Sequence, residues 1–157
     1  STLDVAETTL VSPDAGGAER ARAYAKRLGG DLAIIDKRRS DDGTAEVMNV
    51  VGQVNGRVCI IQDDIVDTAG TLCNAAQALS DAGAKRVLAC AVHGVLSGPA
   101  LDRIEQSPLE ELIVTNTIPM EDARARSGKL RVLSVAKLLG RAIQSIHEET
   151  SVSSLFV

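Results

Sequence analysis

Short apolar runs alternate with amphipathic stretches along most of the chain, and this pattern predicts an α/β fold. The runs are too short for helices and rich in β-branched residues, which is typical of buried strands; they cover residues 8–12, 32–36, 58–62, 87–92, 112–116 and 130–134. Helical patterns follow several of them, at residues 18–28, 72–82, 99–105 and 135–146. We therefore expect a three-layer domain with a parallel sheet covered on both faces and ligands at the carboxyl ends of the strands. The least structured parts are predicted at residues 38–43, 52–56 and 150–157.

The most informative stretch follows the strand predicted at residues 58–62. Three acids are followed by a small-residue turn, giving the sequence Asp63-Asp64-Ile65-Val66-Asp67-Thr68-Ala69-Gly70-Thr71. A tight turn between a strand and a helix offers free backbone N–H groups and the positive end of the helix, so it can bind an anion such as phosphate. The paired acids suit hydroxyl groups or a metal-bound group beside that anion, and a sugar phosphate with a vicinal diol fits both halves. The alternative is that Asp67 caps the helix and the other acids are merely solvated.

Two more polar segments follow predicted strands. Asp14-Ala15-Gly16-Gly17 comes after the first strand, where glycines let the backbone approach a ligand closely and Asp14 could hold Mg²⁺. A plain Pro-Asp-x-Gly turn is the alternative, but beside the first motif we favour a second phosphate loop. Asp36-Lys37-Arg38-Arg39 comes after the second strand, and we interpret it as a mobile basic lid over phosphates rather than a solvated charge cluster. We expect the loop over residues 37–44 to be poorly ordered in the absence of ligand.

Composition narrows the possible partners. The chain has 157 residues, which suits a single domain, and its net charge of −4 argues against a nucleic-acid surface, as do its single Tyr and single Phe. No apolar run approaches the length that crosses a membrane. The three cysteines, Cys59, Cys73 and Cys90, are an odd number without metal-ligand spacing. They are typical of small core residues in a reducing compartment, which predicts a cytoplasmic protein.

The acidic 63–71 stretch resembles the phosphoribosyl-pyrophosphate (PRPP) signature of the type I phosphoribosyltransferase fold. Together with the Asp14–Gly17 and Asp36–Arg39 segments, it resembles the ribose-phosphate diphosphokinase (PRPP synthetase) family. Three further segments share that likeness: His93-Gly94-Val95-Leu96-Ser97-Gly98-Pro99-Ala100, Thr115-Asn116-Thr117-Ile118-Pro119 and Ser151-Val152-Ser153-Ser154-Leu155-Phe156. The likeness runs over nearly the whole chain, but only over the carboxyl-terminal half of the family chain. The start at Ser1 also suggests a piece of a longer protein, so we expect an amino-terminal domain to be missing.

The resemblance implies a role for each matching residue. Lys37 and Arg39 are implied to be catalytic, the first as the catalytic lysine and the second in substrate binding and charge stabilisation. The ribose 5-phosphate site is implied to comprise Asp63, Asp64, Asp67, Thr68, Ala69, Gly70 and Thr71, and the pyrophosphate loop Asp14, Ala15, Gly16 and Gly17. Asp14 is implied to bind Mg²⁺. Ser151, Ser153 and Phe156 match a tail that borders a regulatory site for ADP and phosphate.

By resemblance, the substrates are ATP and ribose 5-phosphate, the products are PRPP and AMP, and the full-length protein forms a homo-oligomer. The histidine that shares Mg²⁺ with Asp14 would lie in the missing half, so we interpret His93 as a structural residue at a strand end. We expect this chain alone to be inactive. Two alternatives stay open: a nucleobase phosphoribosyltransferase that consumes PRPP, and a non-catalytic PRPP-sensing subunit. The first would have no reason to carry the basic lid or the 151–156 tail, and Lys37 and Arg39 argue against the second.

Overall fold

A seven-stranded, mostly parallel sheet organises the molecule. The computed structural model describes residues 4–39 and 46–156, except 121–122 and 124–125. The strand order is β3-β2-β1-β4-β5-β6-β7. Only β2 and β3 pair antiparallel, and the other neighbouring strands of the described chain pair parallel. The strands are β1 (Thr8–Ser12), β2 (Asp31–Arg39), β3 (Glu46–Val51), β4 (Val58–Val66), β5 (Arg86–Gly94), β6 (Glu111–Thr115) and β7 (Leu130–Leu133).

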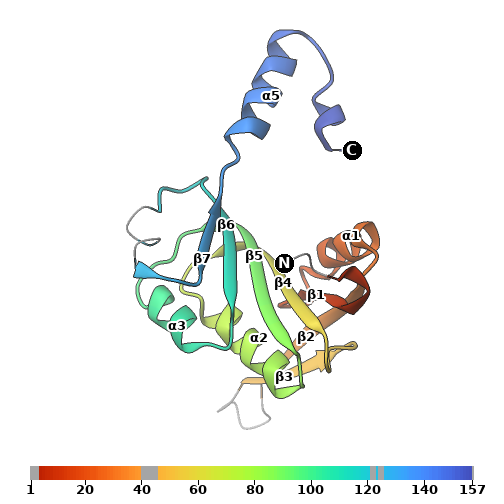
Figure 1. Cartoon of the computed structure of the whole chain (residues 1–157), viewed down its shortest axis with the longest axis vertical. Helices are drawn as coiled ribbons and strands as arrows, with labels where there is room; N and C mark the ends of the chain where they lie inside the picture. Colours follow the sequence, from red (N-terminus) through yellow and green to blue (C-terminus); the bar gives the residue numbers. More distant parts are fainter. Residues whose placement is uncertain (1–3, 40–45, 121–122, 124–125, 157) are drawn as a thin grey trace.

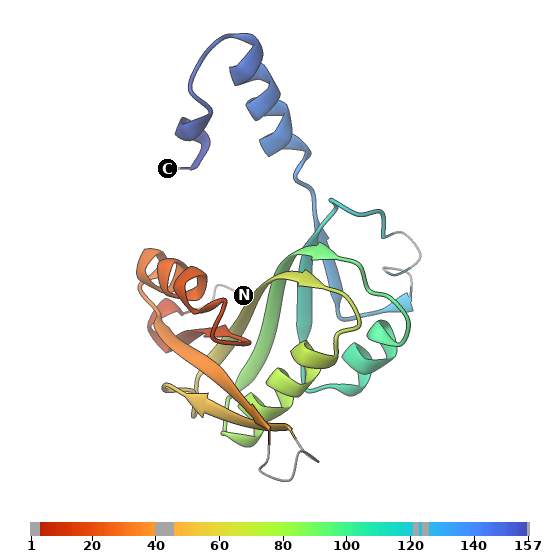
Figure 2. The same ribbon diagram turned by 180° about the vertical axis from the view of Figure 1, so that it is seen from behind.

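The described helices are α1 (Ala18–Leu28), α2 (Gly70–Asp81), α3 (Ala100–Gln106) and α5 (Ala136–His147), with short 3-10 segments η1 (Val5–Glu7) and η2 (Val152–Phe156). Helix α1 lies on one face of this sheet, and α2 and α3 lie on the other (Figures 1 and 2). The chain steps from β1 to β2 in one direction and from β4 through β5 to β6 in the other. Because parallel crossovers are right-handed, the two directions place α1 on one face and α2 and α3 on the other. The predicted three-layer α/β arrangement is therefore confirmed.

The apolar core lies between the sheet and the α2–α3 layer. Its largest fully buried side chains are contributed by strands and helices far apart in the sequence, among them Ile35, Ile61, Leu79, Ile104 and Leu112. Helix α2 buries one face, and Gly83, just after its C-cap residue Ala82, has a positive φ of 85° that suits glycine. This packing fixes the start of α2 against the carboxyl ends of β4 and β5.

The other face of the sheet is only partly covered, which corrects the expectation of cover on both faces. Helix α1 packs on β1 and β2. Beyond it, an apolar hollow of about 370 Å³ opens over β4 to β7, with Tyr24, Val92 and Leu133 on its walls. The amphipathic helix α5 extends away from the sheet, and its contacts are mainly with η2 (Figures 1 and 2). Its apolar side chains are exposed: Leu138, Leu139, Ile143 and Ile146.

Several element boundaries differ from the predicted ones. Helix α1 matches its prediction, whereas α2 begins two residues earlier than expected, at Gly70. Strand β4 continues through the acids to Val66, because Asp63 and Ile65 still pair with β5. The edge strand β3 was not predicted, since its register depends on pairing with β2. Part of the 150–157 segment, predicted to be unstructured, forms η2. No helix in the described parts of the chain is long and apolar enough to cross a membrane.

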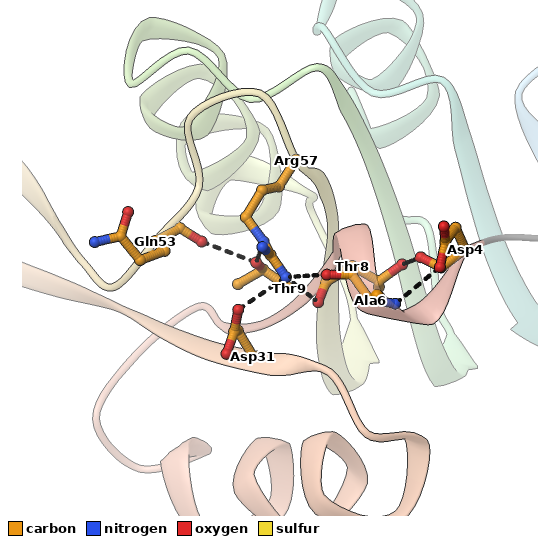
Figure 3. A network of polar contacts seen from close by, with 7 residues as sticks. All are labelled: Asp4, Ala6, Thr8, Thr9, Asp31, Gln53 and Arg57. Carbon is orange, nitrogen blue, oxygen red and sulfur yellow. Dashed lines mark hydrogen bonds and ion pairs between the residues drawn. The ribbon is translucent and has the colours of Figure 1, made fainter.

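Arg57 connects the amino-terminal ends of β1 and β4, as Figure 3 shows. Its Nε donates to Thr9 Oγ1 at 2.8 Å, and Nη2 donates to the carbonyls of Ala6 at 2.9 Å and Thr8 at 3.2 Å. The same nitrogen lies 2.8 Å from a carboxylate oxygen of Asp31. One partly buried guanidinium therefore ties η1, β1 and β2 to the start of β4, at the edge opposite the strand ends discussed next.

Candidate functional site

Residues predicted from three separate segments line one cavity of about 360 Å³ at the carboxyl ends of the central strands. Asp14 reaches it from the loop after β1, Lys37 from β2, and the 63–72 stretch from β4, its loop and the start of α2. Parallel strands bring their carboxyl ends to one edge of a sheet, which explains the convergence. The cavity is open to solvent and lined mainly by polar atoms. Of the pyrophosphate-loop residues, Ala15 and Gly16 line a separate hollow beside α1.

The 67–71 loop leaves the start of α2 without a side-chain cap. Ala69 is the N-cap residue and adopts a left-handed conformation with φ of 58°, while only 5% of it is exposed. An alanine has no polar side-chain atom to cap the helix, so the first backbone N–H groups depend on solvent or a ligand. The alternative in which Asp67 caps the helix is wrong. Asp67 instead accepts a hydrogen bond from the Ser97 hydroxyl.

The two neighbouring acids of β4 have different environments. Burial raises the pKa of Asp63, and the nearby carboxylates of Asp64 and Asp14 add to this effect. Desolvation also disfavours ionisation of Asp64, but hydrogen bonds with Arg20 and Asp63 outweigh it and lower the pKa of Asp64. The Arg20 guanidinium lies 3.1 Å from Asp64 Oδ2. Asp64 is thus the carboxylate of the pair that stays ionised more readily, and the more strongly charged acceptor.

The loop after β1 is held by its own side chains. Ser12 Oγ donates to the Asp14 carbonyl at 2.6 Å, and the Gly17 N–H donates to Asp14 Oδ1 at 2.9 Å. A Cβ on Gly17 would lie 2.7 Å from Ser12 Oγ, so a side chain does not fit there. Glycine at this position is therefore explained by packing within the loop, and Gly17 is the N-cap residue of α1.

The carboxylates of this cavity fit Mg²⁺ only together with phosphate oxygens. Asp14 and Asp63 both line the cavity, and Asp14 is close enough to raise the pKa of Asp63. Within the described residues, no group of three or more His, Cys, Asp or Glu side chains could hold a metal ion. Protein sites for Mg²⁺ commonly use one or two carboxylates, with the remaining ligands supplied by water and substrate phosphates. The residues present match that pattern.

The basic segment predicted as a lid is part of the sheet. Asp36 to Arg39 continue β2 and pair with β3, so these four residues do not form a loop. The Lys37 ammonium donates to Thr71 Oγ1 at 3.2 Å and thereby reaches the start of α2. The backbone of Arg39 pairs with Glu46. The remainder of the loop predicted over residues 37–44, residues 40–44, lies outside the described residues.

The remaining predicted residues lie apart from this cavity. Ser151 precedes η2, while Ser153 and Phe156 belong to it, and none of the three lines the cavity. His93, expected to be structural, has its Nδ1 2.8 Å from Thr117 Oγ1. Arg20 and Arg103, not singled out from the sequence, contact the candidate site through Asp64 and the Thr68 carbonyl. Their exposed helical positions carry no local signal, so only the fold could reveal them.

Comparison with known proteins agrees with this geometry. The family model described as "Phosphoribosyl synthetase-associated domain" matches residues 44–157. The chain belongs to this family. It is 60% identical over 147 residues to a ribose-phosphate pyrophosphokinase of Bordetella pertussis, covering 94% of this chain and 47% of that protein. It therefore spans about half the length of the curated relatives it matches.

Solved structures support the same relationship. The crystal structure of phosphoribosylpyrophosphate synthetase from Mycobacterium smegmatis matches with a TM-score of 0.83 and 41% identity, over 92% of this chain and 46% of that one. Orotate phosphoribosyltransferase from Aeropyrum pernix matches with a TM-score of 0.52 at 19% identity, over 81% of this chain and 58% of that one. The second likeness concerns the fold alone. The predicted family and the type I phosphoribosyltransferase fold are thus confirmed.

Proposed function

We propose that this chain is the part of a PRPP synthetase that binds ribose 5-phosphate and contributes to transfer of the pyrophosphoryl group from Mg-ATP. In this reaction the 1-hydroxyl oxygen of ribose 5-phosphate attacks the β-phosphorus of ATP. The bond from that phosphorus to the α–β bridging oxygen breaks, AMP leaves, and the hydroxyl proton is released. The observation that carries the proposal is the convergence of Asp14, Lys37 and the 63–72 stretch on one polar cavity, in a chain so similar to ribose-phosphate pyrophosphokinases.

The 63–71 stretch would bind the sugar phosphate. The backbone N–H groups of Thr68 to Thr71 would hold the 5-phosphate, because the start of α2 is an uncapped helix end. Asp64 would accept hydrogen bonds from ribose hydroxyls, since its pKa is lowered and the carboxylate stays charged. Arg20 now occupies one of its oxygens, so the sugar would share or displace that ion pair. Asp63, beside it, would bind a second hydroxyl.

Lys37 and Arg39 would supply positive charge where the transferring group spreads negative charge. The observed hydrogen bond from Lys37 to Thr71 Oγ1 supports this role for Lys37, because it brings the ammonium to the edge of the proposed phosphate site. Asp14 would hold Mg²⁺ together with phosphate oxygens, and the ion would neutralise and orient the polyphosphate. The Ala15–Gly17 loop would then face the pyrophosphoryl group.

The further partners are also proposals. ADP and phosphate would act as effectors through the tail residues Ser151, Ser153 and Phe156. An amino-terminal domain would complete the ATP site, and the complete protein would assemble into a homo-oligomer. The greater length of the relatives supports the proposal of a further domain, since this chain covers only 47% of the Bordetella protein.

Titration calorimetry with ribose 5-phosphate tests the proposal directly. Wild-type protein should bind it, and Asp63→Ala should weaken binding by removing an acceptor. Gly70→Val should also weaken it, because a side chain there would stand beside Thr68 and the guanidinium of Arg103. Arg86→Met, at the amino-terminal end of β5 and outside the lining of the cavity, is the control and should bind normally. Unchanged binding by both site variants would contradict the assignment.

A further inference from the structure

The segment that follows β5 lies directly against the proposed phosphate loop. The N–H groups of Val95 and Leu96 donate to the Val66 carbonyl at 2.9 and 3.2 Å, and the Ser97 N–H donates to the Asp67 carbonyl at 3.1 Å. Leu96 adopts a positive φ of 52°, which turns the chain so that Ser97 meets Asp67. These bonds extend the β4–β5 contact beyond the last paired strand residues.

Two side chains of the same region add to this contact. The Ser97 hydroxyl donates to the Asp67 carboxylate. Arg103, from α3, donates its Nη1 to the Thr68 carbonyl at 2.9 Å. A Cβ on Gly70 would lie 3.5 Å from that same nitrogen, so the guanidinium sits beside the first turn of α2. Arg103 lines a neighbouring hollow between α2 and α3 and does not line the 360 Å³ cavity.

Because peptide units are planar, these contacts to carbonyl oxygens also fix the directions of the neighbouring N–H groups in the proposed phosphate loop. In a trans peptide unit, the carbonyl of one residue and the N–H of the next point in opposite directions. Holding the Thr68 carbonyl toward Arg103 therefore directs the Ala69 N–H away from Arg103, on the side of the cavity that Ala69 lines. Holding the Asp67 carbonyl toward Ser97 fixes the Thr68 N–H in the same way.

The loop needs such support because Ala69 has a conformation that L-residues avoid. Without external contacts, the two peptide units beside it could rotate and the N–H groups would no longer converge. A loop already fixed in its binding geometry loses less conformational entropy when the ligand arrives. The positive charge of Arg103, close to the start of α2, also favours an anion there.

We propose that Arg103 and Ser97 are positioning residues that orient the backbone N–H groups of Thr68 and Ala69 toward the phosphate of the bound sugar phosphate. This inference rests on the proposed function of the cavity. It also assigns a role to the 93–100 segment, one of those that resemble the family, because Ser97 belongs to that segment. Neither side chain touches the substrate, so both act through the loop.

The test measures binding of ribose 5-phosphate and of inorganic phosphate by titration calorimetry. Arg103→Met should weaken binding of both probes about 3- to 10-fold, the loss expected for one charge-assisted hydrogen bond in a partly exposed site. Ser97→Ala should have a smaller effect in the same direction, because it removes only the hydroxyl bond to the Asp67 carboxylate and keeps the bond from the Ser97 backbone N–H to the Asp67 carbonyl. Arg103→Lys keeps the charge and a donor, so it should recover part of the affinity. Arg86→Met is the control for loss of a partly exposed arginine and should bind both probes as wild type does.

A second measurement separates positioning from simple loss of stability. Backbone ¹⁵N order parameters of residues 67–70 should fall in Arg103→Met without ligand, while the thermal midpoint stays close to that of Arg86→Met. Normal binding by Arg103→Met would overturn the inference. If wild-type protein binds neither probe, the proposed function fails, and the order parameters alone then test whether Arg103 positions the loop. A decrease in Arg103→Met supports the positioning role, and unchanged values overturn it.

Discussion

Replacing Arg57 should destabilise the fold more than replacing any exposed arginine of the sheet. Arg57→Met removes the guanidinium but keeps an apolar stem of similar length. The carbonyl of Thr8 would lose its side-chain donor, as would that of Ala6, and Thr9 Oγ1 would keep only its bond to the Gln53 carbonyl. The arginine side chain is 22% exposed, so these bonds lie in a partly desolvated environment.

The size of the effect follows from these contacts. Hydrogen bonds to a charged group contribute about 1.5–3 kcal/mol each when desolvated, and less when water competes. The ion pair with Asp31, whose side chain is 58% exposed, adds little. Counting the Thr8 and Thr9 bonds as the main terms, we expect a loss of about 2–4 kcal/mol in the free energy of unfolding. For a domain of this size, that corresponds to a thermal midpoint lowered by about 4–16 °C.

Urea unfolding followed by circular dichroism at 222 nm measures the loss. The midpoint should fall while the slope with denaturant stays constant, since the surface exposed on unfolding is unchanged. The matched control is Arg86→Met, which removes an arginine bound mainly to the exposed carboxylate of Glu110 and should cost much less. An Arg57→Met loss no larger than the Arg86→Met loss would refute the reasoning.

Three further results are expected. In the complete enzyme, Lys37→Ala should lower kcat on the order of 10²–10³-fold at saturating substrates, with little change in thermal midpoint. A near-normal kcat would show that Lys37 has no catalytic role. This chain alone should be folded by circular dichroism yet form no AMP from ATP and ribose 5-phosphate; turnover comparable to a complete synthetase would show that no second domain is needed. Because the pKa of Asp63 is raised in the folded state, its ionisation opposes folding once the pH rises above its ordinary value of 3.8. Asp63→Asn should therefore raise the free energy of unfolding at pH 7 but not at pH 3, and an equal effect at both would exclude this origin.

Local patterns in the sequence were enough for the elements whose formation depends on neighbouring residues. The helix over Ala18–Leu28 was predicted to the residue, because glycines and the change in periodicity mark both its ends. The acidic stretch and small-residue turn at 63–71 likewise identified the strand–loop–helix unit. The order of these motifs along the chain also identified the family, because each motif is contiguous.

The boundaries of β2, β3 and β4 depended on pairing instead. Asp63 and Asp64 look like loop residues in isolation, yet they lie in β4 because β5 continues beside them. The basic 36–39 segment looks like a lid, yet it is strand because β3 pairs with it in an antiparallel ladder. A ladder partner supplies hydrogen bonds that outweigh weak local preferences, and no local pattern reveals that partner.

The sequence by itself thus determined the α/β class, the family and the strand–turn–helix unit at residues 58–81, since these are properties of short contiguous segments. The tertiary structure alone decided which side chains support that turn. Arg20 meets Asp64 across 44 residues of sequence, and Arg103 meets the Thr68 carbonyl across 35. The tertiary structure also shows that no described helix covers the face of β4–β7 next to α1, because α5 extends away from the sheet. Contacts of this range arise from the crossover geometry of the sheet, which places distant segments at one edge.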